Sequence, residues 1–285
     1  MNNIVFLNGQ FLPSNKATVS IFDRGFLYGD GLFETLRSYK GKPFALGLHL
    51  QRLCEGCRTI GIPLKLNKKY LFQCIYKLLK SNGLLKTDAY IRLTVTRGVD
   101  YGSLAPFALS KPTVAIIVKP LHEKIGQYQQ KGIRAIFLNN RRSLPHIKSL
   151  NILPNVTGMM EAHKRKTQEG IFTDGNKILE GTITNIFISD GNGIKTPPVS
   201  DGILPGITRR LVIEIAKRER IKVTEASLTK GELKSCREAF LTNSIMEIAP
   251  LVKMENKLIG TGQVGAFTRR FQQEYKHMPL KQIIP

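Results

Sequence analysis

The segment Lys119-Pro-Leu-His-Glu-Lys-Ile-Gly126 interrupts the strand and helix patterns of this chain, and this interruption most limits the folds available to it. Pro120 ends a strand pattern, and no helical or strand period continues through the segment. The length of 285 residues exceeds one typical domain and fits two. We therefore expect a small N-terminal α+β domain over residues 1–119, a linker over 120–126 and a large C-terminal domain over 127–285.

Local patterns in the first half predict a layer of strands and helices. Asn8-Gly9 and Lys40-Gly41-Lys42 are turn sequences between strand-like runs, so each predicts a hairpin. Apolar periodicity predicts helices over 49–60 and 68–81, a strand over 90–97 and a buried β-branched strand over 113–119.

The second half continues with a mixture of strands and helices. The patterns predict strands over 133–138, 171–173, 183–189 and 239–243, a hairpin over 254–259, and helices over 153–169, 208–220 and 264–275. The fold class expected from both halves is α/β in the α+β sense.

The formal net charge of +22 allows two classes of protein. One binds nucleic acid or a membrane surface, and the other is a basic enzyme whose ligands are anionic. The densest basic clusters, such as Lys164-Arg165-Lys166, are only two or three residues long, and no basic tail is present. We expect solvated helix faces for most of these charges and no nucleic-acid partner.

The cysteines and the N-terminus predict a cytoplasmic protein. Cys54 and Cys57 have the CxxC spacing of redox and zinc sites, but no second CxxC follows and the segment has helical periodicity. We therefore expect structural thiols and no metal site. The sequence has neither a signal-peptide pattern nor an apolar run long enough to span a membrane.

Lys148 and Glu180 have the chemical character of catalytic groups. Lys148 lies between an expected strand and an expected helix, and the neighbouring Ile147 and Leu150 indicate a partly apolar setting. Such a setting favours a neutral amine, which a Schiff-base lysine requires. Glu180 is an isolated carboxylate, and a carboxylate beside a pyridine nitrogen keeps that nitrogen protonated. A solvated lysine is the more common reading of Lys148 taken alone.

Several groups could bind an anion. The run Leu204-Pro-Gly-Ile-Thr208 precedes an expected helix, so the N–H groups of Ile207 and Thr208 and the Thr208 hydroxyl could hold a phosphate. Ser244 follows an expected strand, and Arg52 offers a bidentate guanidinium. A plain N-cap at the helix start is the structural alternative.

Six blocks along the chain resemble the class IV aminotransferases, which are pyridoxal-phosphate (PLP) enzymes of fold type IV. The blocks are Phe22-Asp-Arg-Gly-Phe-Leu-Tyr-Gly-Asp-Gly-Leu-Phe-Glu-Thr35, His49-Leu-Gln-Arg-Leu53, Ile147-Lys-Ser-Leu-Asn151, Leu179-Glu-Gly-Thr-Ile-Thr-Asn185, Gly202-Ile-Leu-Pro-Gly-Ile-Thr-Arg209 and Glu247-Ile-Ala-Pro250. The family includes branched-chain aminotransferases, D-amino acid aminotransferases and 4-amino-4-deoxychorismate lyases.

The resemblance implies a fold, a cofactor and a set of roles. It implies an N-terminal α/β sandwich and a C-terminal β-pseudobarrel with helices, with PLP between the two domains of a homodimer whose subunits both contribute loops to each active site. Lys148 would bind the cofactor covalently and move the Cα proton of a small amino substrate. The phosphate would be held by Arg52, Ile207, Thr208 and Ser244, the pyridinium nitrogen by Glu180 and the ring face by Leu204, while Tyr28, Phe33 and Thr35 would contact the substrate.

One residue departs from the family pattern. Many relatives have a tyrosine after the asparagine of the lysine block, where it bonds the 3-oxygen of PLP, but here that place holds Ile152. D-amino acid aminotransferases also have an aliphatic residue there. The partner of the 3-oxygen therefore stays open.

The choice among activities depends on short matches. The carboxylate trap of D-amino acid aminotransferases is missing, because Phe33 occupies its tyrosine position and no Arg-x-His follows Thr96-Arg97-Gly98. Thr35, Leu153-Pro-Asn155 and Thr242-Asn-Ser244 match aminodeoxychorismate lyases. We expect a lyase that forms 4-aminobenzoate and pyruvate in the folate branch. A branched-chain or D-amino acid aminotransferase is the alternative.

Overall fold

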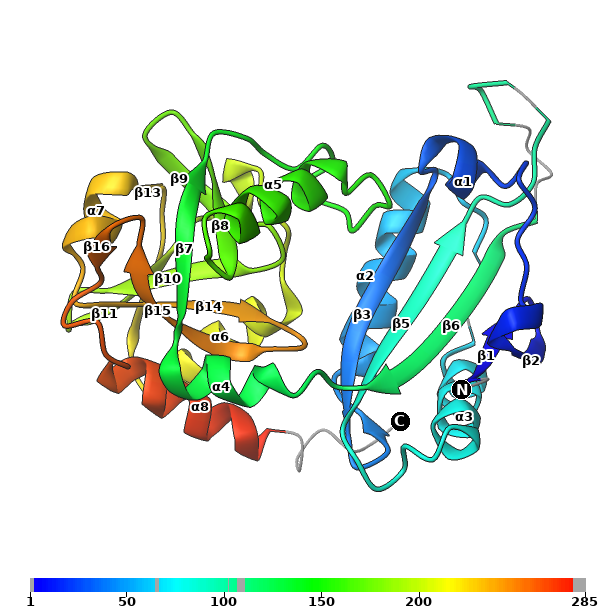
Figure 1. Ribbon diagram of the computed structural model, residues 1–285, viewed down its shortest axis with the longest axis horizontal. Helices are drawn as coiled ribbons and strands as arrows, with labels where there is room; N and C mark the ends of the chain where they lie inside the picture. Colours follow the sequence, from blue (N-terminus) through cyan, green and yellow to red (C-terminus); the bar gives the residue numbers. More distant parts are fainter. Residues whose placement is uncertain (1–2, 65–66, 102, 107–110, 279–285) are drawn as a thin grey trace. The chain divides into compact units, whose positions relative to one another are not determined.

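The computed structural model describes residues 3–64, 67–101, 103–106 and 111–278, which fall into two compact units (Figure 1). The first unit holds the described residues up to Leu121 together with Ile147–Asn151. The second holds His122–His146 and the described residues from Ile152 onward.

The first unit is built on a six-stranded antiparallel sheet with the order β2-β1-β6-β5-β3-β4. The strands are β1 (Ile4–Leu7), β2 (Gln10–Pro13), β3 (Gly31–Tyr39), β4 (Lys42–Pro43), β5 (Ala89–Thr96) and β6 (Thr113–Pro120). The helical elements are η1 (Ser14–Lys16), α1 (Arg24–Tyr28), α2 (Leu46–Thr59) and α3 (Lys68–Ser81).

Turn chemistry explains both hairpins of this sheet. Asn8 and Gly9 have φ angles of 49° and 91° and connect β1 to β2, and Lys40 and Gly41, at 46° and 78°, connect β3 to β4. Positive φ at both central residues is what a two-residue hairpin turn with the twist of the sheet requires. Both predicted hairpins are thus present.

One face of the sheet packs against α2 and α3 (Figure 1). Alternate residues of β3, including Leu32 and Leu36, meet apolar residues such as Leu53 of α2 and Leu78 of α3. The opposite face is only partly covered, and Ile117 of β6 is 40% exposed. The predicted buried strand over 113–119 is therefore half-buried, because successive side chains of a strand point to opposite faces.

The second unit contains a ten-stranded sheet that curls into a half-barrel. Its main strand order is β12-β11-β10-β14-β15-β7-β8-β9-β13, with β16 beside β15, and the pairs β11–β12, β15–β7 and β7–β8 are parallel. The strands are β7 (Ile133–Leu138), β8 (Glu169–Asp174), β9 (Lys177–Gly181), β10 (Asn185–Ser189), β11 (Gly193–Thr196), β12 (Lys222–Glu225), β13 (Leu228–Thr229), β14 (Glu238–Asn243), β15 (Glu247–Met254) and β16 (Lys257–Leu258).

Helices complete this unit: α4 (Lys124–Lys131), α5 (Leu153–Lys164), η2 (Val199–Asp201), α6 (Ile207–Arg218), α7 (Lys230–Ser235) and α8 (Ala266–His277). Both α6 and α8 pack on β14. The rings of Phe187 and Phe240 stack with centroids 5.0 Å apart, and Phe271 of α8 covers Phe240 at 5.6 Å. These aromatic contacts fix α8 against the sheet.

The mixed architecture confirms the predicted fold class. The domain boundaries stay a prediction, although α4 begins at Lys124 inside the expected linker and Ile147–Asn151 lie with the first unit. Sequence patterns missed α4 and β9, and Ile152 caps the start of α5. None of the helices among the described residues has the length and apolar character that crossing a membrane requires.

The core of the first unit can be tested on α3. Leu78 is fully buried there, whereas Tyr76 of the same helix is 46% exposed. Leu78→Ala should lower the free energy of unfolding by about 2–5 kcal/mol, because it leaves a cavity. Tyr76→Ala should change it by about 0.5 kcal/mol or less. Urea denaturation measures both, and equal effects would contradict the described core.

Candidate active site

The backbone around Lys148 pairs with the start of β3. The Phe33 N–H donates to the Lys148 carbonyl and the Leu150 N–H donates to the Gly31 carbonyl, each at 2.9 Å. Ser149 forms a bridge with Leu32, and Asn151 Nδ2 donates to the Gly29 carbonyl at 3.2 Å. The direction of the Lys148 side chain is therefore fixed by strand geometry.

Lys148 Nζ lies 4.6 Å from the centroid of the Phe33 ring. The guanidinium carbon of Arg92, on β5, lies 3.8 Å from the same centroid. Thr35 is the cross-strand partner of Arg92, so their side chains project from the sheet face that carries Phe33. The structure thus places Phe33 next to the predicted lysine and Thr35 on the same sheet face as Phe33, and it adds Arg92, which the sequence did not indicate.

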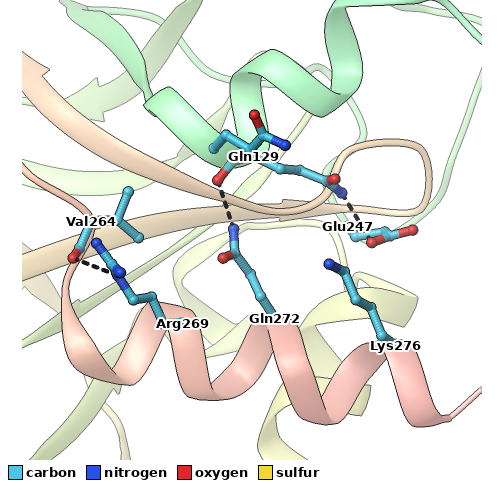
Figure 2. A pocket seen from close by; sticks show the side chains of 7 residues that line it. Gln129, Glu247, Val264, Arg269, Gln272 and Lys276 are labelled. Atoms are coloured by element: carbon cyan, nitrogen blue, oxygen red, sulfur yellow. Dashed lines mark hydrogen bonds between the residues drawn. The ribbon is translucent and has the colours of Figure 1, made fainter.

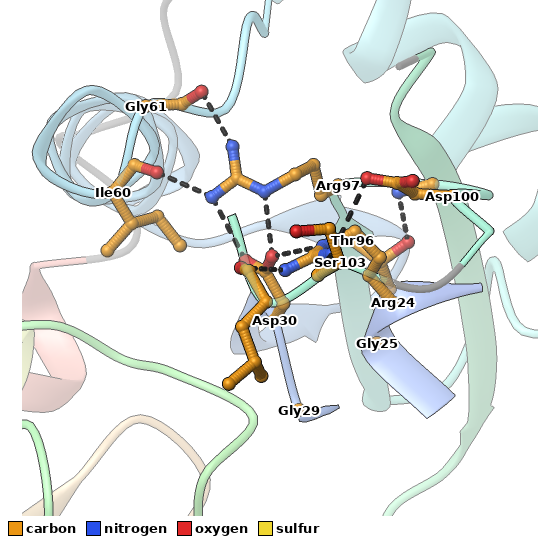
Figure 3. Close-up of polar contacts among 12 residues, drawn as sticks. Arg24, Gly25, Gly29, Asp30, Ile60, Gly61, Thr96, Arg97, Asp100 and Ser103 are labelled. Atoms are coloured by element: carbon orange, nitrogen blue, oxygen red, sulfur yellow. Dashed lines mark hydrogen bonds and ion pairs between the residues drawn. The ribbon is translucent and has the colours of Figure 1, made fainter. Parts of the chain in front are cut away.

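Tyr28, the third predicted substrate residue, is the last residue of α1. The guanidinium carbon of Arg24 lies 4.9 Å from the centroid of the Tyr28 ring. Figure 3 shows the network around Arg24. Asp30 accepts hydrogen bonds from Arg24 Nε at 2.8 Å and from Arg97 Nε at 2.7 Å. Arg97 also donates to the carbonyls of Ile60 and Gly61 after α2.

This network holds the segment that leads into β3. Burial would raise the pKa of Asp30, but hydrogen bonds from Arg97 and Arg24 lower it below its ordinary value. Asp30 therefore stays ionised and ties the segment before β3 to the residues that follow α2.

Arg52 forms a two-point ion pair with the carboxylate of Glu34. Its Nε and Nη2 donate to the two oxygens of Glu34 at 2.8 and 2.7 Å, and His49 Nδ1 lies 2.6 Å from Glu34 Oε2. Glu34 is 1% exposed and belongs to the face of β3 that packs on α2. The side chain proposed to bind phosphate is thus oriented by an ion pair on its own unit.

The charges of this triad are coupled. Burial would raise the pKa of Glu34, but Arg52 and then His49 lower it to about 2. Burial lowers the pKa of His49, and Glu34 only partly opposes this effect. Glu34 is therefore an anion at neutral pH, and Arg52 is its main counter-charge.

In the second unit, Glu180 is the penultimate residue of β9 and is 2% exposed. Its Oε1 accepts from Arg142 Nε at 3.0 Å, and its Oε2 accepts from the Leu204 N–H at 3.1 Å. Asn185 Nδ2 lies 3.5 Å from Glu180 Oε2 and donates to the Leu204 carbonyl at 3.0 Å. The carboxylate is therefore fixed, together with the backbone of Leu204.

The start of α6 has the properties of an anion site. Gly206 is its N-cap and provides no side chain, so the N–H groups of Ile207 and Thr208 have no partner within the helix. A Cβ at Gly206 would lie 1.9 Å from Asn185 Oδ1, so only glycine fits. Thr208 Oγ1 lies 3.4 Å from Tyr275 Oη of α8.

Ser244 lies in the turn between β14 and β15. Asn243 Oδ1 accepts from the N–H groups of Ile245 and Met246 and so holds this turn. Just before it, the buried Thr242 Oγ1 has no hydrogen-bond partner in the described part of the chain. A buried polar atom without a partner indicates a missing ligand or water.

A groove elsewhere in the second unit is separate from the predicted residues. Its volume is about 280 Å³, and it lies between α4 and α8 (Figure 2). Gln129 Nε2 donates to Glu247, and Gln272 Nε2 donates to the Gln129 carbonyl. None of the predicted site residues lines this groove.

The ionic partners were the main omission of the sequence analysis. Glu34 lies between Leu32 and Leu36 on the core-facing side of β3. An acid at such a position needs a cationic partner, so the strand pattern could have predicted an ion pair there. Arg142, which pairs with Glu180, had no such signal. Cys57 is buried, and burial raises the pKa of its thiol to about 12, which makes it unreactive at neutral pH.

The buried triad predicts a pH-dependent stability. Glu34→Gln should destabilise the protein by about 3–5 kcal/mol at neutral pH, because Arg52 loses its counter-charge. The folded pKa of about 2 lies below the ordinary 4.5, so the contribution of Glu34 is present above pH 4.5 and is lost as the pH falls toward 2. The difference between wild type and variant should shrink over this range.

Urea denaturation at a series of pH values measures this difference. Glu55→Gln is the matched control, because Glu55 is an exposed carboxylate on α2, the helix that carries Arg52. A constant difference across the acid range would contradict the coupling of Glu34 to Arg52.

Comparison with known proteins identifies the family. The model of the family described as "Amino-transferase class IV" matches residues 31–254. A protein of Methanocaldococcus jannaschii, provisionally named a branched-chain-amino-acid aminotransferase, is 38% identical over 97% of this chain and 96% of its own length. Aminodeoxychorismate lyase of Bacillus subtilis is 34% identical over 96% of this chain and 94% of its own length.

A solved structure agrees with these relatives. The branched-chain amino acid aminotransferase of Escherichia coli superposes with a TM-score of 0.91 and 28% identity, covering 98% of this chain and 95% of that chain.

Class IV aminotransferases use PLP, and the residues of this chain fit that group. The start of α6, which has no capping side chain, suits a phosphate, and the buried Thr242 Oγ1 offers a polar atom for a ligand. Glu180 is a fixed carboxylate, and Lys148 supplies an amine beside an aromatic ring. This chain belongs to the class IV aminotransferase family of PLP-dependent enzymes.

Proposed function

We propose that this enzyme is a 4-amino-4-deoxychorismate lyase, which forms 4-aminobenzoate and pyruvate in the folate branch. Thr35, Leu153-Pro-Asn155 and Thr242-Asn-Ser244 match lyases of the family, and the relative from Bacillus subtilis carries this name. The free cysteines of the described residues suit a cytoplasmic enzyme.

The observation that carries this proposal is that Thr35 and Arg92 lie on the same sheet face as Phe33, whose ring contacts Lys148. Aminodeoxychorismate has two carboxylates, and a guanidinium binds a carboxylate with two parallel hydrogen bonds. The side chain of a branched-chain amino acid offers no such partner, and it would desolvate the guanidinium without compensation. A hydroxyl and a guanidinium on this face therefore favour an acidic substrate.

The residues of the chain divide the chemistry between them. PLP, when bound, supplies an electron sink for a bond broken at the amine-bearing carbon. Lys148 holds the cofactor and removes the proton from that carbon. The bond to the enolpyruvyl oxygen then breaks, the ring becomes aromatic, and protonation of the released enol gives pyruvate.

The remaining residues bind and orient. Arg52, Ile207, Thr208 and Ser244 would hold the phosphate, Leu204 would pack against the ring, and Glu180 would keep the proton on the pyridine nitrogen. Tyr28, Phe33 and Thr35 contact the substrate. Arg142 and Glu34 act through others, because they orient Glu180 and Arg52.

An amino-acid aminotransferase is the second candidate. The relative with 38% identity and the superposed structure from Escherichia coli favour it, since both carry the name of branched-chain enzymes. In that reaction Lys148 would again move the Cα proton, and bound PLP would supply the means of passing the amino group to a 2-oxo acid. The same residues serve both reactions, so substrate tests must decide between them.

We further propose that the enzyme is a homodimer that uses the apolar surface around α1. Ile21, Phe26, Tyr101 and Leu104 are between 65% and 79% exposed, and Phe22 contacts the Tyr101 ring at 5.0 Å. Exposed apolar patches of this kind mark protein interfaces. In a two-fold symmetric dimer the same surface of each copy faces the other, so we propose a second copy of the chain as the partner.

The covalent role of Lys148 predicts a spectroscopic change. Purified enzyme with PLP should be yellow, and Lys148→Ala should lose the absorbance band of the lysine-bound cofactor. Formation of 4-aminobenzoate should fall by at least about 10²–10⁴-fold, because the variant lacks the base. Lys164→Ala, on an exposed part of α5, is the control. A retained band in Lys148→Ala would contradict the assignment of the lysine.

Substrate tests separate the two activities. L-leucine, D-alanine and L-glutamate, added in turn without a 2-oxo acid, should leave the yellow band unchanged, while aminodeoxychorismate should yield 4-aminobenzoate. If one amino acid bleaches the band and no 4-aminobenzoate forms, the enzyme is an aminotransferase for that amino acid.

The proposed dimer interface predicts a change of oligomeric state. Phe26→Glu places a charge on a side chain that is 74% exposed in the described chain, and it should convert the dimer to a monomer. Light scattering after gel filtration measures the mass. Tyr70→Glu, on the exposed side of α3, should leave the dimer intact. A Phe26→Glu variant that stays dimeric would place the interface elsewhere.

A further inference from the structure

Glu169 is a buried carboxyl group that the proposed reaction does not use. It begins β8 and has no exposed surface. Its Oε1 accepts hydrogen bonds from the Gly170 N–H at 2.9 Å, from the Thr182 N–H at 3.0 Å and from the Thr182 hydroxyl. Its Oε2 accepts from the Thr184 hydroxyl at 3.0 Å. All these donors are neutral, whereas Glu34 and Glu180 are paired with arginines.

Apart from the Gly170 bond, these hydrogen bonds come from one turn. Thr182 to Thr184 connect β9 to β10, and the N–H of Gly181, the last residue of β9, donates to the Thr184 carbonyl at 2.8 Å. Asn155 Nδ2 donates to the Thr182 carbonyl from α5. A Cβ on Gly181 would lie 2.0 Å from Thr184 Oγ1 and 3.1 Å from the Glu169 carboxyl carbon. The turn therefore packs on Glu169 without spare room.

The two ends of this turn carry Glu180, which pairs with the pyridine nitrogen in the proposed function, and Asn185, which bonds the Leu204 backbone. Glu180 immediately precedes Gly181, and Asn185 immediately follows Thr184. Their side chains approach within 3.5 Å of each other and both bond the backbone of Leu204. A shift of the turn would therefore displace Glu180, Asn185 and the Leu204 backbone together.

We infer that Glu169 is a positioning residue, which acts through the hydroxyls of Thr182 and Thr184 to hold Glu180 and Asn185 in place. This inference rests on the proposed role of Glu180 at the pyridine nitrogen, but not on the choice between lyase and aminotransferase. Groups that orient a ligand-binding residue commonly matter nearly as much as the residue itself.

The charge state of Glu169 suits this role. Burial raises the pKa of Glu169, and hydrogen bonds from Thr182, Gly170 and Thr184 oppose that rise only in part. A neutral carboxyl group can donate its proton to a threonine hydroxyl and still accept the backbone bonds. Glutamine has the same shape and hydrogen-bonding pattern as this neutral form.

The test measures how each variant changes the affinity for PLP and the protonation of the bound cofactor. Each variant is reconstituted with PLP, and two quantities are recorded: the PLP dissociation constant and the pH midpoint of the visible band of the bound cofactor. Glu180→Gln is the reference, since it should shift the midpoint directly. Thr173→Val is the matched control. Thr173 is a buried threonine of β8, the strand that begins with Glu169, and its hydroxyl donates to the Leu138 carbonyl instead of bonding Glu169.

The double variant Thr182→Val/Thr184→Val should weaken PLP binding by about tenfold or more and move the pH midpoint toward that of Glu180→Gln. Glu169→Gln should stay within about twofold of wild type in both quantities. Thr173→Val should lower thermal stability but leave both quantities unchanged. Glu169→Ala is a second disruptive variant if the double variant does not fold.

The outcomes separate the inference from the function on which it rests. If Glu180→Gln does not move the midpoint, the proposed role of Glu180 is wrong. If Glu180→Gln moves it but the threonine variants behave like Thr173→Val, then Glu169 does not position Glu180 and the inference is overturned.

Discussion

The backbone pairing between Ile147–Asn151 and the first residues of β3 determines the arrangement of the first unit's candidate site. Because the Phe33 N–H and the Leu150 N–H each donate across this pairing, Lys148 cannot rotate away from the sheet without losing hydrogen bonds. The alternation of β3 then places Phe33 on the side of Lys148 and Glu34 on the side of α2. A slip of one residue would exchange these faces.

Buried carboxylates are a second recurring constraint. Glu34 and Glu180 each have an arginine partner, and Asp30 has two. A charge removed from water must be paired, so these arginines are committed to the interior of their units. Glu169 is different, because neutral donors surround it.

The family relationship and the activity rest on different kinds of evidence. Family membership follows from matches along most of the chain. The proposed substrate depends on a few side chains around Lys148, above all on Thr35 and Arg92. Relatives with different names are nearly equally similar, so overall similarity does not select the substrate. The chemistry of the sheet face beside the lysine carries that choice.

The sequence by itself determined the features that depend on local physical chemistry. The apolar period predicted α3 and β7 with their observed bounds, and Asn8-Gly9 predicted a hairpin because few residues accept positive φ. The apolar period did not predict α4, because this helix is short and mostly polar. The ordered blocks also identified Lys148 and Glu180 as candidates, since their neighbours in the chain carry the resemblance.

Only the tertiary structure decided which side chains meet. Arg142 and Glu180 are 38 residues apart, Glu34 and Arg52 are 18 apart, and Arg92 reaches Phe33 across a strand pair. No local pattern selects one arginine among 43 basic residues for a particular carboxylate. The choice follows from sheet register and helix packing, which bring distant residues within a few ångströms. Sequence periodicity fixes the face on which a residue lies, whereas the partner on that face is set by the fold.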